Sequence, residues 1–139
     1  MDINNLLKAL DDDDNSHLLN LTNQKIKTMK KEIITELDLE PSKMNDYLSK
    51  LENYRYIDGM NELKYGLFLR WIPIQDPNNI ILKQGGIFCD LKVTDSGVII
   101  VYKNFRHKHY QFKMDECLIF QKLSDQEQVL LSALDHLSK

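Results

Sequence analysis

The first part of the chain carries its hydrophobic residues at helical spacing. From Ser16 onward they recur at steps of three and four residues, which predicts a helix of about twenty residues capped by Asn15 or Ser16. This stripe consists of Leu19, Thr22, Ile26, Met29, Ile33 and Leu37. The other face carries a lysine run that is typical of a solvated surface: Lys25, Lys27, Lys30 and Lys31.

A second helix is predicted to begin at Pro41, because proline suits the first turn of a helix and disfavours helical geometry in the residue before it. Its apolar positions again follow helical spacing: Met44, Tyr47, Leu48, Leu51 and Tyr54. We expect this helix to end near Asp58 and Gly59. The first half of the chain is therefore predicted to be α-helical.

After Gly66 the hydrophobic period shortens to two residues, which indicates β-strands. Five short strands are expected, at residues 67–74, 87–94, 98–103, 109–114 and 117–121. In the second strand the alternation assigns one face to Ile87, Cys89, Leu91 and Val93. The next turn, Asp95, Ser96 and Gly97, is a three-residue loop whose glycine closes a hairpin in a left-handed conformation.

These elements predict an α+β fold with N-terminal helices, a five-strand antiparallel small barrel of SH3-like or OB-like type, and a C-terminal helix. Curling the sheet would remove its two exposed edges, and Gly85 and Gly86 would supply the bend. Ser124 and Glu127 form a capping box for the last helix. That helix presents an apolar face of Val129, Leu130, Ala133, Leu134 and Leu137.

We expect an acidic flexible tail at residues 1–15, a helical region at 16–62, and the barrel with its helix at 63–139, the last two forming one compact unit. The net charge of the 139 residues is −3, and residues 1–20 hold five acids and one lysine. The remainder is almost neutral and attracts polyanions only weakly. The run from Asp11 to Asp14 is interpreted as a solvated connector, with an autoinhibitory cover for a basic surface as the alternative.

Hydrophobic residues make up 42% of the chain, which is typical of a globular domain. The longest apolar run, residues 98–102, is too short to cross a bilayer, and we expect no secretory signal. Cys89 and Cys117 are then expected to be free thiols in an intracellular protein. Composition alone therefore predicts a globular intracellular protein and does not indicate its function.

Metal binding and catalysis are disfavoured by the spacing of the candidate residues. Cys89 and Cys117 form no C-x-x-C pair, and His107 and His109 stand among cations. A cysteine nucleophile with a histidine base remains a third hypothesis, but nothing in the sequence places the two together. We expect no metal, no cofactor and no enzymatic activity.

Residues 33–57 contain a regularly spaced set that consists of Leu37, Leu39, Pro41, Ser42, Met44, Leu48, Leu51, Glu52 and Ile57. With this pattern the segment resembles a winged-helix DNA-binding unit. The resemblance implies that Lys43 and Lys50 face nucleic acid with Ser42, Asn45, Asp46 and Ser49, and that the strand after Leu63 begins the wing. Arg55 departs from the pattern, because a glycine usually stands at that position, and Asp38 and Asp46 oppose phosphate contact. A helical hairpin packed on the barrel is the alternative.

The segment 103–110 joins two predicted strands and mixes cations with aromatic residues. Its candidate binding residues are Lys103, Phe105, Arg106 and Lys108. Aromatic rings stack on unpaired bases and cations bind phosphates, so this composition indicates a single-strand nucleic-acid surface. A polar hairpin loop with Phe105 folded onto the core is the alternative. Trp71 is interpreted as a core anchor.

A wider set of residues is spread over residues 50–137 and consists of Tyr54, Arg55, Asp58, Gly66, Arg70, Trp71, Gly85, Gly86, Lys103, Asn104, Phe120, Gln121, Lys122 and Glu127. With these residues the segment resembles a family of small uncharacterised proteins from nucleocytoplasmic large DNA viruses. The resemblance implies a viral protein in the host cytoplasm, the viral factory or the virion, and assigns no activity.

The leading functional hypothesis is a non-enzymatic binding module, a viral nucleic-acid-associated or gene-expression factor. Its nucleic-acid contacts would come from Lys43, Lys50, Lys103, Phe105, Arg106 and Lys108. The alternative is a protein–protein interaction or scaffold protein that binds another viral protein or forms a homodimer.

Overall fold

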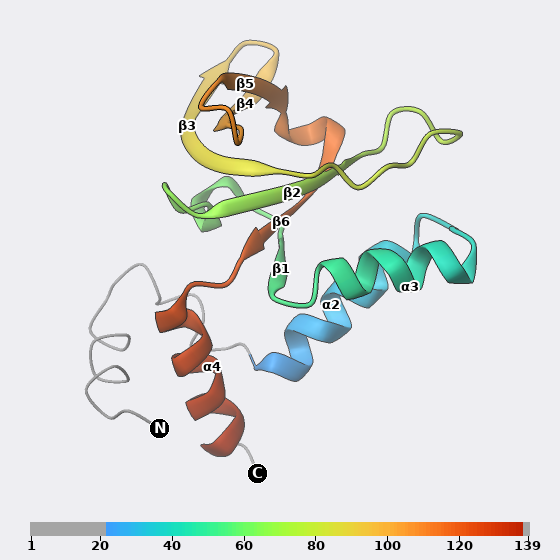
Figure 1. The fold of residues 1–139 in the computed structure, drawn as a ribbon, viewed down its shortest axis with the longest axis vertical. Coiled ribbons are helices and arrows are strands. Elements are labelled where there is room, and N and C mark those ends of the chain that lie inside the picture. Colours follow the sequence, from blue (N-terminus) through green and yellow to red (C-terminus); the bar gives the residue numbers. More distant parts are fainter. Residues whose placement is uncertain (1–21, 138–139) are drawn as a thin grey trace. The chain divides into compact units, whose positions relative to one another are not determined.

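The computed structural model describes residues 22–137 and has an α+β fold (Figure 1). The helices are α2 (Asn23–Thr35), α3 (Pro41–Lys50) and α4 (Asp125–Leu137). The strands are β1 (Tyr54–Ile57), β2 (Phe68–Pro73), β3 (Gly86–Thr94), β4 (Gly97–Lys103), β5 (His109–Lys113) and β6 (Cys117–Lys122), with short 3₁₀ turns η2 (Met60–Glu62) and η3 (Met114–Glu116). The predicted class and the C-terminal helix are confirmed. The acidic tail at 1–15 and the caps Asn15 and Ser16 lie outside the described residues.

The strands form an open six-stranded antiparallel sheet, so the prediction of a five-strand closed barrel is wrong. The order is β1-β6-β2-β3-β4-β5, which leaves β1 and β5 as edges. β6 inserts beside β2, with Leu69 opposite Gln121 and Pro73 opposite Cys117. Four consecutive residues of β6 are buried, which suits an interior strand better than one that continues a meander at the edge.

Strand β1 is an element that the sequence pattern does not predict, because the helical spacing of the apolar residues extends to Tyr54. Helix α3 begins at Pro41 as predicted but ends at Lys50, and Leu51 caps it. The turn after Lys50 leads directly into Tyr54–Ile57, where buried and half-buried positions alternate. The strand expected to begin a wing, β2, instead lies inside the sheet between β6 and β3.

A bulge in β3 reverses the predicted facing of its first side chains. Phe88 pairs with Tyr102, but the next pair joins Asp90 to Val101, so Cys89 is the extra residue. Phe88 is 2% exposed and Ile87 is 41% exposed, the opposite of the simple alternation. The following hairpin pairs Thr94 with Gly97, so its loop has two residues and not the predicted three.

The chain divides into two compact units: residues up to Arg55 with those from Leu123 onward, and Tyr56–Lys122. In the first unit, α2 packs against α3 and α4. The buried face of α2 is Ile26, Lys30 and Ile34. Met29 is 40% exposed and Lys30 only 4%, so the predicted assignment of these two residues is wrong. The capping box of α4 is confirmed, because the Ser124 amide donates to Glu127 Oε1 (2.9 Å) and the Glu127 amide to Ser124 Oγ (3.1 Å).

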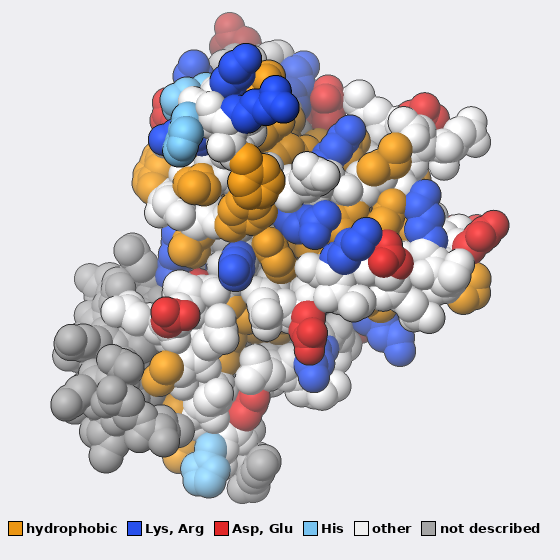
Figure 2. Space-filling view, in the orientation of Figure 1, with side chains coloured by type: hydrophobic (Ala, Val, Ile, Leu, Met, Phe, Trp, Pro, Cys, Tyr) orange, Lys and Arg blue, Asp and Glu red, His pale blue; other side chains and the backbone are white. Residues whose placement is uncertain are grey.

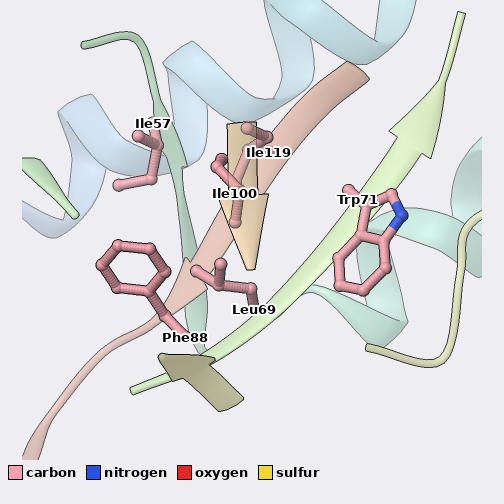
Figure 3. Packing of buried hydrophobic residues seen from close by; sticks show 6 residues of the cluster. All are labelled: Ile57, Leu69, Trp71, Phe88, Ile100 and Ile119. Carbon is pink, nitrogen blue, oxygen red and sulfur yellow. The ribbon is translucent and has the colours of Figure 1, made fainter. Parts of the chain in front are cut away.

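The second unit has its own hydrophobic core, to which five strands contribute. Figure 3 shows the cluster, which consists of Ile57, Leu69, Trp71, Phe88, Ile100 and Ile119. All six are less than a tenth exposed. This core supports the strands and loops that carry the candidate site.

Candidate functional site

An open groove of about 480 Å³ lies in the second unit, between the end of the β4–β5 hairpin and the segment just before β3. We call it the aromatic groove. Four aromatic residues line it, together with cationic and other polar groups and one glycine: Trp71, Tyr102, Phe105, Tyr110, Lys83, Arg106, Gln84, Asn104 and Gly85. Among the described residues, no aspartate or glutamate lines this groove.

The four aromatic residues differ in exposure, since Trp71 is buried, Tyr102 is half-buried, and Phe105 and Tyr110 are exposed. Trp71 is 5% exposed, and its ring lies 4.4 Å from that of Tyr102, centroid to centroid. Phe105 and Tyr110 are 72% and 48% exposed. The Tyr110 ring lies 5.9 Å from that of Tyr102, and the Phe105 ring 5.8 Å from that of Phe68. The exposed rings of Phe105 and Tyr110 offer flat surfaces on which a planar ligand stacks.

The hydroxyl of Tyr102, which is half-buried, is partly desolvated. Burial raises the pKa of the Tyr102 hydroxyl above its ordinary value of 10.0, and the neighbouring Tyr110 adds to the increase. Tyr102 is neutral at physiological pH with or without this increase, so it repels no anion that enters the groove.

The loop that carries Phe105 and Arg106 is fixed by the side chain of Asn104. Its Oδ1 accepts hydrogen bonds from the backbone N–H groups of Arg106 (2.9 Å) and Lys108 (3.0 Å). Its backbone N–H donates to the Lys108 carbonyl (2.9 Å), and the His107 N–H donates back to the Asn104 carbonyl (3.0 Å). His107 takes the left-handed conformation that closes the turn, with φ of 61°. These bonds hold the loop in a defined shape at the groove.

The opposite wall is tied to β2 by backbone contacts and by glycine. The Lys83 N–H donates to the Trp71 carbonyl (2.8 Å), and Arg70 Nε donates to the Lys83 carbonyl (3.0 Å). Gly85 has φ of +100°, and a Cβ there would overlap the Leu69 carbonyl oxygen. The glycine thus allows the close approach that brings Lys83 beside Trp71.

The structure brings together part of the predicted site. Phe105 and Arg106 line the aromatic groove, while Lys103 and Lys108 flank them on the same hairpin without lining it. Figure 2 shows lysine, arginine and histidine side chains beside hydrophobic ones over this end of the sheet. The sequence pattern missed Lys83, because the segment before β3 has no regular period.

The other two predicted residues, Lys43 and Lys50, lie on α3 in the first unit and already have local partners. Lys50 Nζ lies 3.0 Å from Asp46 Oδ2, in an exposed i,i+4 ion pair. Lys43 Nζ lies 5.7 Å from the centroid of the Tyr47 ring. The ion pair reduces the charge that Lys50 offers to a phosphate, so these lysines are weaker candidates than the hairpin residues.

The structure gives little support to a cysteine nucleophile or to a metal site. Burial, together with Glu116, raises the pKa of the Cys117 thiol to about 11, which keeps it protonated and poorly nucleophilic at neutral pH. Across residues 22–137, no three histidine, cysteine or acidic side chains gather as metal ligands. No helix in this part of the chain is long and apolar enough to span a bilayer.

Comparison of the chain with known protein families, with curated proteins and with solved structures finds no match in any of the three. The functional inference therefore depends on the geometry of the groove.

Proposed function

We propose that the aromatic groove binds single-stranded nucleic acid, with bases stacked on Phe105 and Tyr110 and phosphates bound by Arg106 and Lys83. The observation that carries this proposal is the combination of exposed aromatic rings and unopposed cations around one groove. Base stacking on aromatic side chains contributes about 1–3 kcal/mol per base and tolerates any sequence. Duplex bases are already stacked, so the groove favours unpaired strands.

The small number of cations around the groove keeps this binding modest and only weakly dependent on salt. Few cations take part, so few counterions are released, and the slope of log affinity against log salt is shallow, about −0.7 per phosphate bound. On the resemblance of residues 50–137 to proteins of large DNA viruses, we further propose that this binding serves viral gene expression or genome handling.

Trp71 provides a direct probe, since it is the single tryptophan of the chain and lines the groove. Titration with 12-nucleotide single-stranded DNA and RNA at low salt is expected to change its fluorescence, and fluorescence polarisation of labelled strands gives the affinity. Duplexes of the same length are expected to bind more weakly. Equal binding of duplex, or no binding of single strands in the tens of micromolar, would contradict the proposal.

Matched variants separate stacking from general effects. Phe105→Ala is expected to weaken binding by about 5–150-fold, the equivalent of one lost stacking contact. Tyr65→Ala removes an aromatic residue that is 68% exposed and outside the groove, and it should leave affinity unchanged. Arg106→Ala should make the salt slope shallower by about 0.7, whereas Lys92→Ala on the exposed part of β3 should not.

A further inference from the structure

A second groove, of about 560 Å³, lies in the same unit and shares no lining residue with the aromatic groove. It is formed by the ends of β1 and β6 with the 3₁₀ turns η2 and η3. Its apolar surface includes Met60, which is 48% exposed, and Ile74, which is 39% exposed, together with Met114 and Leu118. Met60 and Ile74 are exposed and Met114 is half-buried, and exposed apolar side chains around a groove are typical of an interaction surface.

The charge of this groove is opposite to that of the aromatic groove. Asp58 and Asp115 line it, and among the described residues no lysine or arginine does so. Glu62 Oε2 accepts the backbone N–H groups of Asp58 (3.0 Å) and Gly59 (2.8 Å), which brings a third carboxylate beside the same segment. Asp58 and Asp115 repel phosphates, which disfavours nucleic acid as the ligand of this surface. We call it the acidic groove.

The apolar lining includes two methionines, one from η2 and one from η3. Methionine is flexible and polarisable, so Met60 and Met114 adjust to apolar side chains of differing shape. The carboxylates at the rim add a preference for positive charge, which favours correct partners and accelerates association. The apolar lining and the acidic rim together match a peptide that carries apolar side chains and positive charges.

We propose that the acidic groove docks a basic amphipathic segment of a partner protein, one that presents an apolar side chain to Met60 and Met114 and lysine or arginine to Asp58 and Asp115. This docking is independent of the aromatic groove. With both grooves in use, the unit holds a nucleic-acid strand at one surface and a protein partner at the other.

The test is a selection of 12-residue peptides displayed on phage against the full chain. Counter-selection uses Asp58→Lys/Asp115→Lys, and the matched control is Asp90→Lys/Asp95→Lys, which makes the same charge change on exposed residues outside the groove. We expect enriched peptides that place leucine, methionine or phenylalanine beside lysine or arginine. They should bind the counter-selection variant about tenfold more weakly than the wild type, and the control variant with unchanged affinity.

Methyl NMR of the wild-type protein tests peptide docking in the acidic groove even where the charge-reversed variant fails to fold. A synthetic peptide of the selected sequence should shift the Met60 and Met114 methyl signals and leave Met29, on α2, unchanged. The proposal is overturned if no peptide is enriched, if acidic or uncharged peptides predominate, or if the methyl shifts fall elsewhere. Self-association of the wild type that the double variant abolishes would assign the groove to a second copy and overturn it as well.

Discussion

Arg55 Nε lies 3.8 Å from Glu127 Oε2, and the two side chains are 3% and 0% exposed. Arg55 stands on β1 and Glu127 in the first turn of α4, so the ion pair connects elements remote in sequence within one compact unit. Glu127 also accepts the Ser124 amide in the capping box. A glycine at position 55, as the winged-helix pattern expects, would leave this carboxylate without the neighbouring guanidinium.

We expect Arg55→Met to lower the free energy of unfolding by about 3–5 kcal/mol, because removing one member of a buried ion pair leaves a charge buried in a poorly solvated environment. The measurement is urea denaturation followed by circular dichroism. Glu127→Gln retains an oxygen that accepts the Ser124 amide and removes the charge, so it should cost less.

The double variant Arg55→Met/Glu127→Gln completes the cycle. It should be more stable than the sum of the two single changes predicts, by at least about 1 kcal/mol, since neither buried charge remains. If the changes in the free energy of unfolding of the two single variants add up to that of the double variant, the two side chains contribute independently to stability. That result would contradict a stabilising interaction between Arg55 and Glu127.

Lys30 provides a second test of the helical unit. Its Nζ donates hydrogen bonds to the carbonyls of Leu51 (2.7 Å) and Glu52 (3.1 Å), at the C-terminal end of α3. Lys30→Met should cost about 1–3 kcal/mol, because a buried carbonyl loses its donor. The matched control is Lys31→Met, which removes an exposed lysine from the same helix and should change stability by less than about 0.5 kcal/mol.

The same lysine predicts a pH dependence of stability. Burial lowers the pKa of Lys30 below its ordinary value of 10.5, and the charge of Lys27 lowers it further, while Glu52 opposes the shift. The unfolded chain therefore binds this proton more tightly than the folded chain does. The stability of wild type relative to Lys30→Met should rise with pH in the window below 10.5, as measured by urea denaturation between pH 7 and 10.5. If the stability difference between wild type and Lys30→Met falls as the pH rises, the pKa of Lys30 is not lowered in the folded protein.

The sequence predicts those features that depend on local chemistry. Pro41 marks the start of α3, Ser124 and Glu127 form their capping box, and the Gly97 hairpin joins two adjacent strands. In each case a few neighbouring residues determine the backbone conformation. The aromatic and cationic composition of the β4–β5 loop was visible for the same reason, and Phe105 and Arg106 do share one groove.

Features that depend on partners remote in sequence were not predicted. The position of β6 beside β2 depends on hydrogen bonding between strands that lie far apart in the sequence. The bulge at Cys89 determines which of Ile87 and Phe88 enters the core. Lys30 appears in the sequence as one more solvated lysine, because the carbonyls that it binds, those of Leu51 and Glu52, follow the end of α3, about twenty residues further along the chain. Lys83 likewise reaches the aromatic groove through backbone bonds to β2, which no periodicity reveals.

We expect the Cys117 thiol to react slowly with alkylating reagents. Its pKa of about 11, against an ordinary 9.0, makes its thiolate fraction at pH 8 about a hundredfold smaller than that of an ordinary cysteine. Iodoacetamide labelling of the Cys89→Ser protein, followed by mass spectrometry, should therefore be about a hundredfold slower than labelling of the same protein unfolded in urea. Fast labelling of the folded protein would show an activated thiol and revive the cysteine-nucleophile hypothesis.

Asn104 should act as a positioning residue for the aromatic groove. Asn104→Ala removes the acceptor of the Arg106 and Lys108 amides, so hydrogen exchange at both amides should accelerate while the free energy of unfolding falls by about 0.5–1.5 kcal/mol. Oligonucleotide affinity should then fall by about 3–10-fold, because the loop must be ordered again on binding. Asn79→Ala changes an exposed turn asparagine outside the groove and should alter neither amide exchange nor affinity. Faster exchange with unchanged affinity would show that the loop does not hold the strand.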